Sequence, residues 1–132
     1  MYSGKKKHSK KNLNTFFKSI AYFKVSNLNL ASDNKKLKKE ILIHFPSIKI
    51  DSKSSNYMYL DILKDKSYFL KILEMAPIHN ESIVFIDNLN QKQEIWKEII
   101  QIKYITVSID MYYCGMLFFR KEQAKEHFII RI

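Results

Sequence analysis

Residues 82–132 decide the fold, and they read SIVFIDNLNQKQEIWKEIIQIKYITVSIDMYYCGMLFFRKEQAKEHFIIRI. Apolar runs predict strands at Ile83–Asp87, Ile105–Asp110 and Gly115–Phe119, and the first is apolar enough to be buried on both faces of a parallel sheet. Gln91–Tyr104 carries the apolar stripe of a helix, and Lys121–Ile130 is interpreted as a closing helix. A strand, helix and strand of this length imply a right-handed parallel crossover, whereas the last two strands must be antiparallel or one bent strand. This region therefore predicts a mixed sheet with helices packed on it.

The preceding residues add further elements to this frame. The apolar stripe of a helix leads into an extended run near Tyr22–Val25, and Ser26–Asn34 is expected to be a loop because of its Ser, Asn and Asp content. Ser32 or Asp33 is expected to cap the next helix, which Pro46 ends. Further along we expect a short strand at Ile48–Ile50, a strand at Tyr57–Leu63 and, in preference to a hairpin strand, a short helix at Tyr68–Ala76.

Together these elements predict one α/β (α+β) domain. It would cover residues 13–132 and hold a mixed sheet of four to five strands with about four helices packed on it. Residues 1–12 carry five lysines and no acidic residue, so repulsion between like charges predicts a flexible basic arm. A chain of 132 residues, 46% of them apolar, can bury a core without disulfides.

Composition excludes several classes of protein. No apolar run approaches the length of about 18 residues that a membrane-spanning helix needs. No apolar segment follows the basic N-terminus, so no secretory signal is expected. The single cysteine, Cys114, suits a reducing compartment and predicts a cytoplasmic location. With glycine only at positions 4 and 115, no P-loop or dinucleotide fingerprint can form, and no cofactor is expected.

The net charge of +10 is confined to the first half of the chain. Residues 1–66 carry 15 lysines and 5 acidic residues, whereas residues 67–132 carry 8 basic and 8 acidic residues. Such asymmetry points to an acidic protein or a nucleic acid as partner. Two facts favour an alternative interpretation, in which the lysines form an ordinary solvated surface without a binding role. Lysines outnumber arginines by 21 to 2, although arginine suits phosphate recognition better, and an AT-rich gene also produces a Lys- and Asn-rich chain. The candidate binding residues are Lys5, Lys6, Lys7, Lys10, Lys11, Lys35, Lys36, Lys38 and Lys39.

Two groups of residues offer candidate chemistry. If the crossover places its strands side by side, Asp87 and Asp110 lie at one sheet edge, where they could hold Mg²⁺ for a hydrolase or nuclease reaction. No third acid or positioned base accompanies them, and aspartate commonly ends strands. Cys114 with His127 or His79 is the available thiol–imidazole pair, but a lone cysteine in apolar sequence is typical of a core.

Aromatic residues cluster around Gly115 in a way that suits either stacking or packing. Aromatic side chains on a sheet stack RNA bases in some proteins, but the order of basic, glycine and aromatic residues typical of that motif is not met here. Core packing across strands is the favoured interpretation. The residues concerned are Tyr112, Tyr113, Phe118 and Phe119.

Three functions follow from these observations. The leading hypothesis is a non-enzymatic interaction protein, such as an inhibitor, an immunity-type protein or an accessory factor, that docks on an acidic partner through its lysines. The alternative is an RNA- or DNA-binding accessory protein that places the same lysines on phosphates. The third is a small metal-dependent hydrolase or nuclease that uses Asp87 and Asp110.

Overall fold

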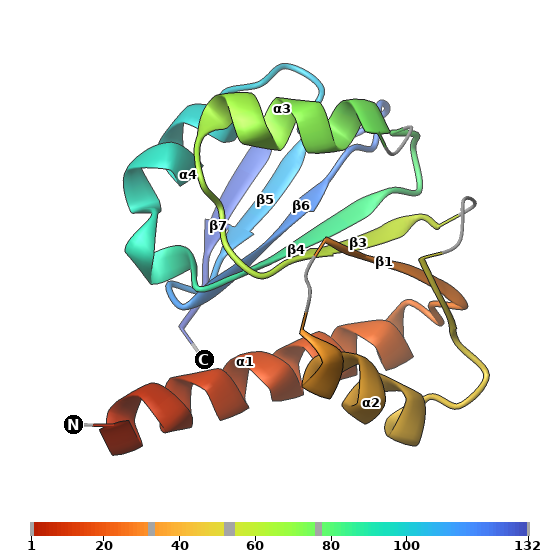
Figure 1. Ribbon diagram of the computed structural model, residues 1–132. Coiled ribbons are helices and arrows are strands. Elements are labelled where there is room, and N and C mark those ends of the chain that lie inside the picture. Colours follow the sequence, from red (N-terminus) through yellow and green to blue (C-terminus); the bar gives the residue numbers. More distant parts are fainter. Residues whose placement is uncertain (1, 32–33, 52–54, 76–77, 132) are drawn as a thin grey trace.

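The chain folds into three layers, in which a seven-stranded sheet lies between two pairs of helices (Figure 1). The computed structural model describes residues 2–31, 34–51, 55–75 and 78–131. Within them the helices are α1 (Tyr2–Tyr22), α2 (Lys35–His44), α3 (Lys66–Met75) and α4 (Gln93–Ile99), with a short 3-10 helix η1 (Leu89–Gln91) before α4. The strands are β1 (Asn27–Ala31), β2 (Lys49–Ile50), β3 (Tyr57–Leu60), β4 (Ile83–Asp87), β5 (Val107–Asp110), β6 (Cys114–Phe118) and β7 (Glu126–Ile129). Helices α1 and α2 cover one face of the sheet, and α3 and α4 cover the other.

The α/β class and the mixed sheet are confirmed, but the sheet has more strands than the four to five expected. Their order is β2-β1-β3-β4-β6-β5-β7, and β6 alone among these strands is antiparallel to its neighbours. The expectation that β4 and β5 are neighbours is wrong, because β6 lies between them. A tight loop forces β6 to run antiparallel to β5, and β6 then pairs with β4 from Asp87↔Cys114 to Ile83↔Phe118.

Local signals set the ends of α2. The Asn34 side chain accepts a hydrogen bond from the Leu37 backbone N–H at 3.1 Å and so caps the helix, while the expected caps, Ser32 and Asp33, lie outside the described residues. The helix ends at His44, as the proline two residues later predicts.

The two later helices follow their expected positions with different bounds. The short helix expected at Tyr68–Ala76 is confirmed as α3, which begins at Lys66. The helix expected at Gln91–Tyr104 is shorter, because η1 precedes α4 and a turn after Ile99 returns the chain to β5. Both segments are therefore helical as expected, and only the first and last residues of the helices differ from the prediction.

The expected loop at Ser26–Asn34 is wrong, because it contains β1. Leu28 and Leu30 are buried and alternate with half-buried asparagines, which is the period of a strand. β1 lies between β2 and β3, so ladder bonds on both sides offset the poor strand preference of asparagine. The extended run expected near Tyr22–Val25 is also wrong at its start, since α1 reaches Tyr22 and Lys24 turns the chain with a φ of 52°.

The closing helix expected at Lys121–Ile130 is wrong, because the chain forms strand β7 there. The Glu126 N–H donates to the Thr106 carbonyl oxygen at 2.8 Å, and the Ile130 N–H donates to the Asp110 carbonyl oxygen at 2.8 Å. The edge of β5 thus supplies backbone hydrogen-bond partners for a strand, whereas a helix would bond its N–H groups to its own carbonyl oxygens. The aromatic and β-branched side chains of this segment also favour a strand.

The lysine-rich segment expected as an arm is helical from Tyr2 onward and belongs to α1. This helix spans the boundary expected after residue 12 and runs on to Tyr22. Lysine is a good helix former, so a charged segment can extend a helix that is anchored further along. Asn12 provides such an anchor, since it is only 3% exposed.

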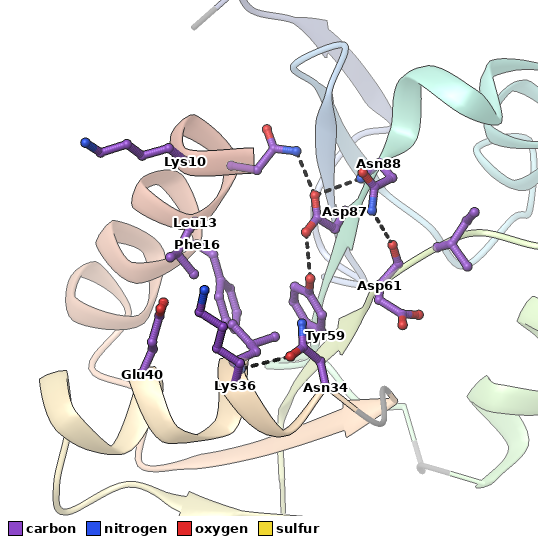
Figure 2. Close-up of a pocket in the computed structure, with 13 residues that line it drawn as sticks. Lys10, Leu13, Phe16, Asn34, Lys36, Glu40, Tyr59, Asp61, Asp87 and Asn88 are labelled. Atoms are coloured by element: carbon purple, nitrogen blue, oxygen red, sulfur yellow. Dashed lines mark hydrogen bonds between the residues drawn. The ribbon is translucent and has the colours of Figure 1, made fainter. Parts of the chain in front are cut away.

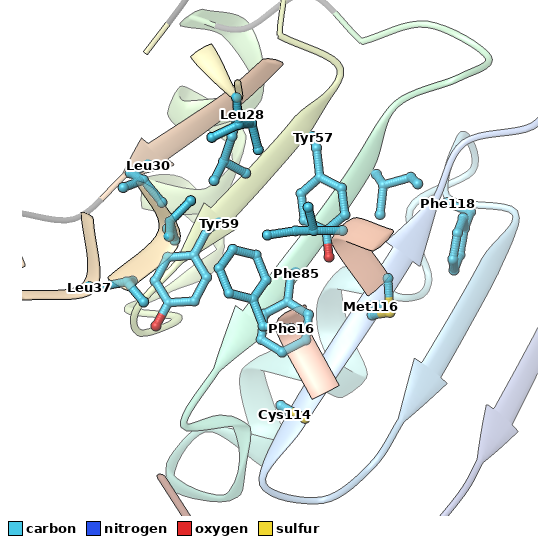
Figure 3. Packing of buried hydrophobic residues seen from close by; sticks show 14 of the residues in the cluster. Phe16, Leu28, Leu30, Leu37, Tyr57, Tyr59, Phe85, Cys114, Met116 and Phe118 are labelled. Atoms are coloured by element: carbon cyan, nitrogen blue, oxygen red, sulfur yellow. The ribbon is translucent and has the colours of Figure 1, made fainter. Parts of the chain in front are cut away.

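Each face of the sheet has its own hydrophobic cluster. The cluster beneath α1 and α2 includes Phe16, Tyr57 and Phe85 (Figure 3). The cluster beneath α3 and α4 includes Phe69 and Trp96. No helix in the part of the chain described here is both long and apolar enough to cross a bilayer.

Candidate ligand cavity

A cavity of about 560 Å³ lies between α1, α2 and the carboxyl ends of β1, β3 and β4 (Figure 2). Its volume is within the range of about 300–1,000 Å³ that is usual for small-molecule sites. At this point the strand order reverses, since β2 lies on one side of β1 and β3 on the other. Connections that leave such a point in opposite directions open a crevice, and ligands of open α/β sheets bind there.

The Asp87 carboxylate is the centre of a hydrogen-bond network at the back of the cavity. Its Oδ1 accepts from Asn12 Nδ2 at 2.6 Å and from the Asn88 backbone N–H at 2.8 Å. Its Oδ2 accepts from the Tyr59 hydroxyl at 2.6 Å. Hydrogen bonds to an ionised acceptor are among the stronger ones in proteins. Asp87 therefore ties α1 to the ends of β3 and β4.

The Tyr59 hydroxyl stays a donor throughout the ordinary pH range. Burial raises the pKa of Tyr59, and the charge of Asp87 and the hydrogen bond to it raise that pKa further. The ring lies against Phe16, with centroids 4.8 Å apart, and stacks on Phe85 at 5.9 Å. Tyr59 thus gives the cavity an apolar wall and a fixed hydroxyl.

Asn12 has one buried polar atom whose hydrogen bonding is incomplete. Its Nδ2 donates to Asp87 and also to the Tyr113 carbonyl oxygen at 2.8 Å, so both amide protons have acceptors and the amide orientation is determined. Its Oδ1 is buried and has no hydrogen-bond partner among the residues that the structure describes. A buried acceptor without a donor costs about 1–3 kcal/mol. A hydrogen-bond donor of a bound molecule would remove this cost.

Charges of both signs surround the mouth of the cavity. Lys10 of α1 and Lys36 of α2 line it and are exposed, and neither forms an ion pair with a described residue. Asp61, after β3, and Glu40, on α2, line it as well and are half-buried. The amino end of α2 adds the partial positive charge of its first backbone N–H groups. The mouth of the cavity can therefore attract a positively charged group and a negatively charged group of one ligand.

The lysines predicted from the sequence fall into two groups. Lys10 and Lys11 are exposed on α1, and α1 lies with α2 on one face of the sheet (Figure 1). The lysines of α2 lie in its first two turns and are exposed; they are Lys35, Lys36, Lys38 and Lys39. The remaining three belong to the first turns of α1; they are Lys5, Lys6 and Lys7. Among the lysines whose side chains the structure describes, Lys10 and Lys36 line the cavity.

The proposed pairing of Asp87 with Asp110 in a metal site does not fit this geometry. The two residues end β4 and β5, which are separated by β6. Both Asp87 oxygens already accept hydrogen bonds, and Asp110 Oδ1 accepts from the Tyr112 backbone N–H at 2.8 Å. Among the residues that the structure describes, no three His, Cys, Asp or Glu side chains are grouped to hold a metal ion.

The thiol–imidazole pair considered from the sequence has no support in the contacts. Cys114 is fully buried, and burial, followed by the charges of Asp87 and Asp110, raises its pKa to about 12. His79 Nε2 pairs with Asn56 at 2.6 Å, and His127 Nδ1 pairs with Ser108 at 2.6 Å. Cys114 is therefore a core residue that remains protonated at neutral pH.

The aromatic residues beside Gly115 are divided between core and surface. Phe118 and Phe119 are buried on opposite faces, as core packing predicts. Tyr112 is 40% exposed and lies edge-on to Tyr113, with ring centroids 4.7 Å apart. They do not form the continuous exposed platform that base stacking needs.

Asn12 and Tyr59 were not found from the sequence. One signal was present for Asn12, since it lies four residues before Phe16 and seven before Ser19, on the face of α1 that is buried. Comparison with known proteins supplies no further candidates, because no family model, no curated protein and no solved structure matches this chain.

Proposed function

We propose that this protein binds a small zwitterionic molecule in the cavity at the carboxyl ends of β1, β3 and β4. The observation that carries the proposal is the coincidence of a cavity of about 560 Å³ with the point where the strand order reverses. The buried Oδ1 of Asn12, which has no partner among the described residues, supports it, because a ligand with a hydrogen-bond donor would satisfy this acceptor.

The lining residues define the chemistry of the ligand. Lys10, Lys36 and the amino end of α2 attract a carboxylate or phosphate, whereas Asp61 and Glu40 attract an ammonium group. Leu13, Phe16 and the Tyr59 ring provide an apolar wall. A molecule of amino-acid or nucleoside size with both charges matches this set.

A binding role fits better than a catalytic one. The described lining residues include no cysteine, serine or histidine, so they form no Ser–His or Cys–His nucleophile pair. Both oxygens of Asp87 are engaged in the contacts to Asn12, Asn88 and Tyr59. The described lining thus offers groups for recognition, and Asp87 is held by these hydrogen bonds rather than left to accept a proton from a substrate.

Thermal unfolding in the presence of a panel of amino acids and nucleosides tests this proposal. We expect one zwitterion to raise the unfolding temperature while its uncharged analogue does not, since a ligand at 100 times its Kd stabilises the native state by about 2.7 kcal/mol. Lys36→Ala should weaken the effect, and Lys71→Ala, exposed on α3 at the opposite face, should leave it unchanged. No shift with any member of the panel, and no small molecule carried by the purified protein in native mass spectrometry, would refute the proposal.

A second candidate function is docking on an acidic protein through α1 and α2. It is supported by the exposure of Lys10, Lys11 and the α2 lysines on one side of the sheet, and by the lack of ion pairs between them and the described residues. Lys35, Lys38 and Lys39 do not line the cavity, so they are free to serve a separate surface. Complementary charge of this kind mainly accelerates association.

The association rate with protein partners captured at low salt tests the docking surface. Lys35→Glu with Lys39→Glu should slow association, and the same rate should fall with rising salt. Lys97→Glu with Lys103→Glu, two exposed lysines of the trailing half, should have little effect. Retention of nucleic acid in place of a protein would favour phosphate binding instead, with a salt slope set by the number of phosphates neutralised.

A further inference from the structure

Two oppositely charged side chains of α2 lie one helical turn apart on the wall of the cavity. Lys36 and Glu40 both line it, and Figure 2 shows both extending from α2 toward α1. A separation of four residues places them on one side of the helix, about 6 Å apart along its axis. The order of lysine before glutamate is the less favourable one for pairing within a helix, and no ion pair joins them or links either to another described residue. Both charges are therefore available to a ligand.

The other charged groups around the cavity are less suited to hold the two ends of one molecule. The side chain of Lys10 extends away from the other labelled residues in Figure 2. Asp61 follows β3 on the strand side of the cavity, and both carboxylate oxygens of Asp87 already accept hydrogen bonds from the protein. Lys36 and Glu40 thus form the one pair of opposite charges carried by a single element among the described lining residues.

Apolar side chains accompany this pair. Leu13 and Phe16 of α1 and Leu37 of α2 line the same cavity, and Figure 2 shows Leu13 and Phe16 reaching from α1 toward Lys36. Phe16 and Leu37 are buried, and Leu13 is half-buried. A hydrocarbon segment that lies against them is removed from water, which favours binding. The wall therefore favours a ligand whose charged ends are joined by methylene groups.

We propose that the cavity takes an ω-amino acid in which three or four methylene groups separate an ammonium group from a carboxylate; this inference rests on the proposed function and names the ligand class for the same site. A C–C bond of about 1.5 Å adds about 1.3 Å along an extended chain, so such a spacer holds the two charges about 5–6 Å apart. The carboxylate lies at Lys36, where the positive amino end of α2 adds to the attraction, and the ammonium group lies at Glu40.

The spacing of the charges distinguishes this class from other molecules of similar size. The two charged groups of an α-amino acid share one carbon atom, so they do not span two side chains that stand a full helical turn apart. An unmodified nucleoside carries no charge at neutral pH and makes use of neither Lys36 nor Glu40. A longer spacer has to fold against the apolar wall before both of its ends reach their partners.

Calorimetric titration with a series of unbranched amino acids tests the proposal. Only the spacer changes from glycine, through 4-aminobutyrate and 5-aminopentanoate, to 8-aminooctanoate. We expect the affinity to be highest with three or four methylene groups and to be lower by about tenfold for glycine, since one charged contact is then lost. Butyrate, which lacks the ammonium group, and butylamine, which lacks the carboxylate, should each bind less tightly than 4-aminobutyrate.

Two variants assign the ends of the ligand. Glu40→Gln should remove the advantage of 4-aminobutyrate over butyrate, and Lys36→Gln should remove its advantage over butylamine, because each variant deletes the partner of one charged group. Glu98→Gln is the matched control, since Glu98 is exposed on α4 at the opposite face of the sheet, and it should leave every affinity unchanged. A merely structural effect would weaken 4-aminobutyrate and its two singly charged analogues alike.

Three results overturn the proposal. In the first, an α-amino acid or a nucleoside binds more tightly than every ω-amino acid; the cavity then binds a small molecule by another arrangement, and the proposed function still stands. In the second, Glu40→Gln and Lys36→Gln weaken the charged ends without distinction. In the third, no member of the series or of the wider panel binds and the purified protein carries no small molecule, and the proposed function fails as well.

Discussion

Beneath α1 the sheet buries hydroxyl, amide and carboxylate groups, whereas beneath α3 and α4 it buries mainly hydrocarbon. On the first face Ser19 bonds to Tyr57, and Asp87 accepts from both Asn12 and Tyr59. On the second face the large buried side chains are apolar, and the buried Ser108 lies at the margin, bonded to His127. The same sheet thus supports two interiors of different polarity.

This difference separates the sources of stability from the site. Burial of apolar surface contributes about 25 cal/mol per Å² on both faces, and beneath α3 and α4, where few buried polar contacts accompany it, the cluster acts as a scaffold. Buried hydrogen bonds add little net free energy, but they fix the orientation of the groups that they join. Substitutions beneath α3 should therefore change stability, and substitutions beneath α1 should change the geometry of the cavity.

The largest expected effect is on the apolar face. Phe69→Ala should lower the free energy of unfolding by about 3–5 kcal/mol, since it removes a fully buried ring. Urea unfolding measures the loss, and Tyr68→Ala, a half-buried neighbour on α3, should cost much less. If the ligand affinity of the remaining folded protein fell as well, the separation of scaffold from site would be wrong.

A smaller loss on the same face is expected from an added methyl group. The Cβ of an alanine at position 115 would lie 2.8 Å from Leu89 Cδ2 and 2.9 Å from Trp96 Cη2. Gly115→Ala should therefore cost about 1–3 kcal/mol through overpacking. Trp96 is the single tryptophan, so its fluorescence reports the displacement directly. An unchanged spectrum and unchanged stability would contradict the packing described.

On the polar face, Asp87→Asn should cost about 1–2 kcal/mol, because it removes the charge that strengthens the bonds from Asn12 and Tyr59. The pKa of Tyr59 should fall, since that charge helps to raise it, while burial still keeps it above the ordinary value. Urea unfolding and tyrosinate absorbance measure the two effects. Asp110→Asn, whose carboxylate bonds one exposed backbone N–H, should do less, and equal effects would refute the network.

The last effect is confined to alkaline solution, where it concerns stability and is expressed per titrating group. Tyr57, Tyr59 and Cys114 have pKa values raised by burial in the folded chain, so the unfolded chain loses their protons first. Stability should be constant below about pH 8.5 and then fall, by up to about 1.4 kcal/mol per pH unit for each group, first through the cysteine and then through the tyrosines near pH 10. Urea unfolding across this range measures the slope. Tyr57→Phe should reduce it above pH 10, and a flat profile would show that these groups are not buried.

Much of the architecture follows from local signals. Pro46 marks the end of α2, and the apolar run at Ile83–Asp87 marks a strand that is buried on both faces except at Asp87. Errors arose where tertiary partners decide the conformation. β1 alternates asparagine with leucine and becomes a strand because it has neighbours on both sides, and β7 becomes a strand because β5 has a free edge.

The site was less predictable than the fold. Asp87 was recognised as the end of a strand at the ligand-binding edge of the sheet, but its partner was expected to be Asp110. The actual partners, Asn12 and Tyr59, are 75 and 28 residues away in sequence, and an intervening antiparallel strand removes Asp110 from reach. Contacts over such separations depend on strand order, which periodicity does not encode.

Because the single cysteine is buried, the chemical reactivity of its thiol reports transient opening of the fold. Cys114 lies in the cluster beneath α1, and its pKa of about 12 keeps it unreactive while the cluster is closed (Figure 3). An alkylating reagent can therefore modify it only during moments when α1 lifts away from the strands. The rate of modification would then measure how often α1 separates from the strands, and no label has to be introduced.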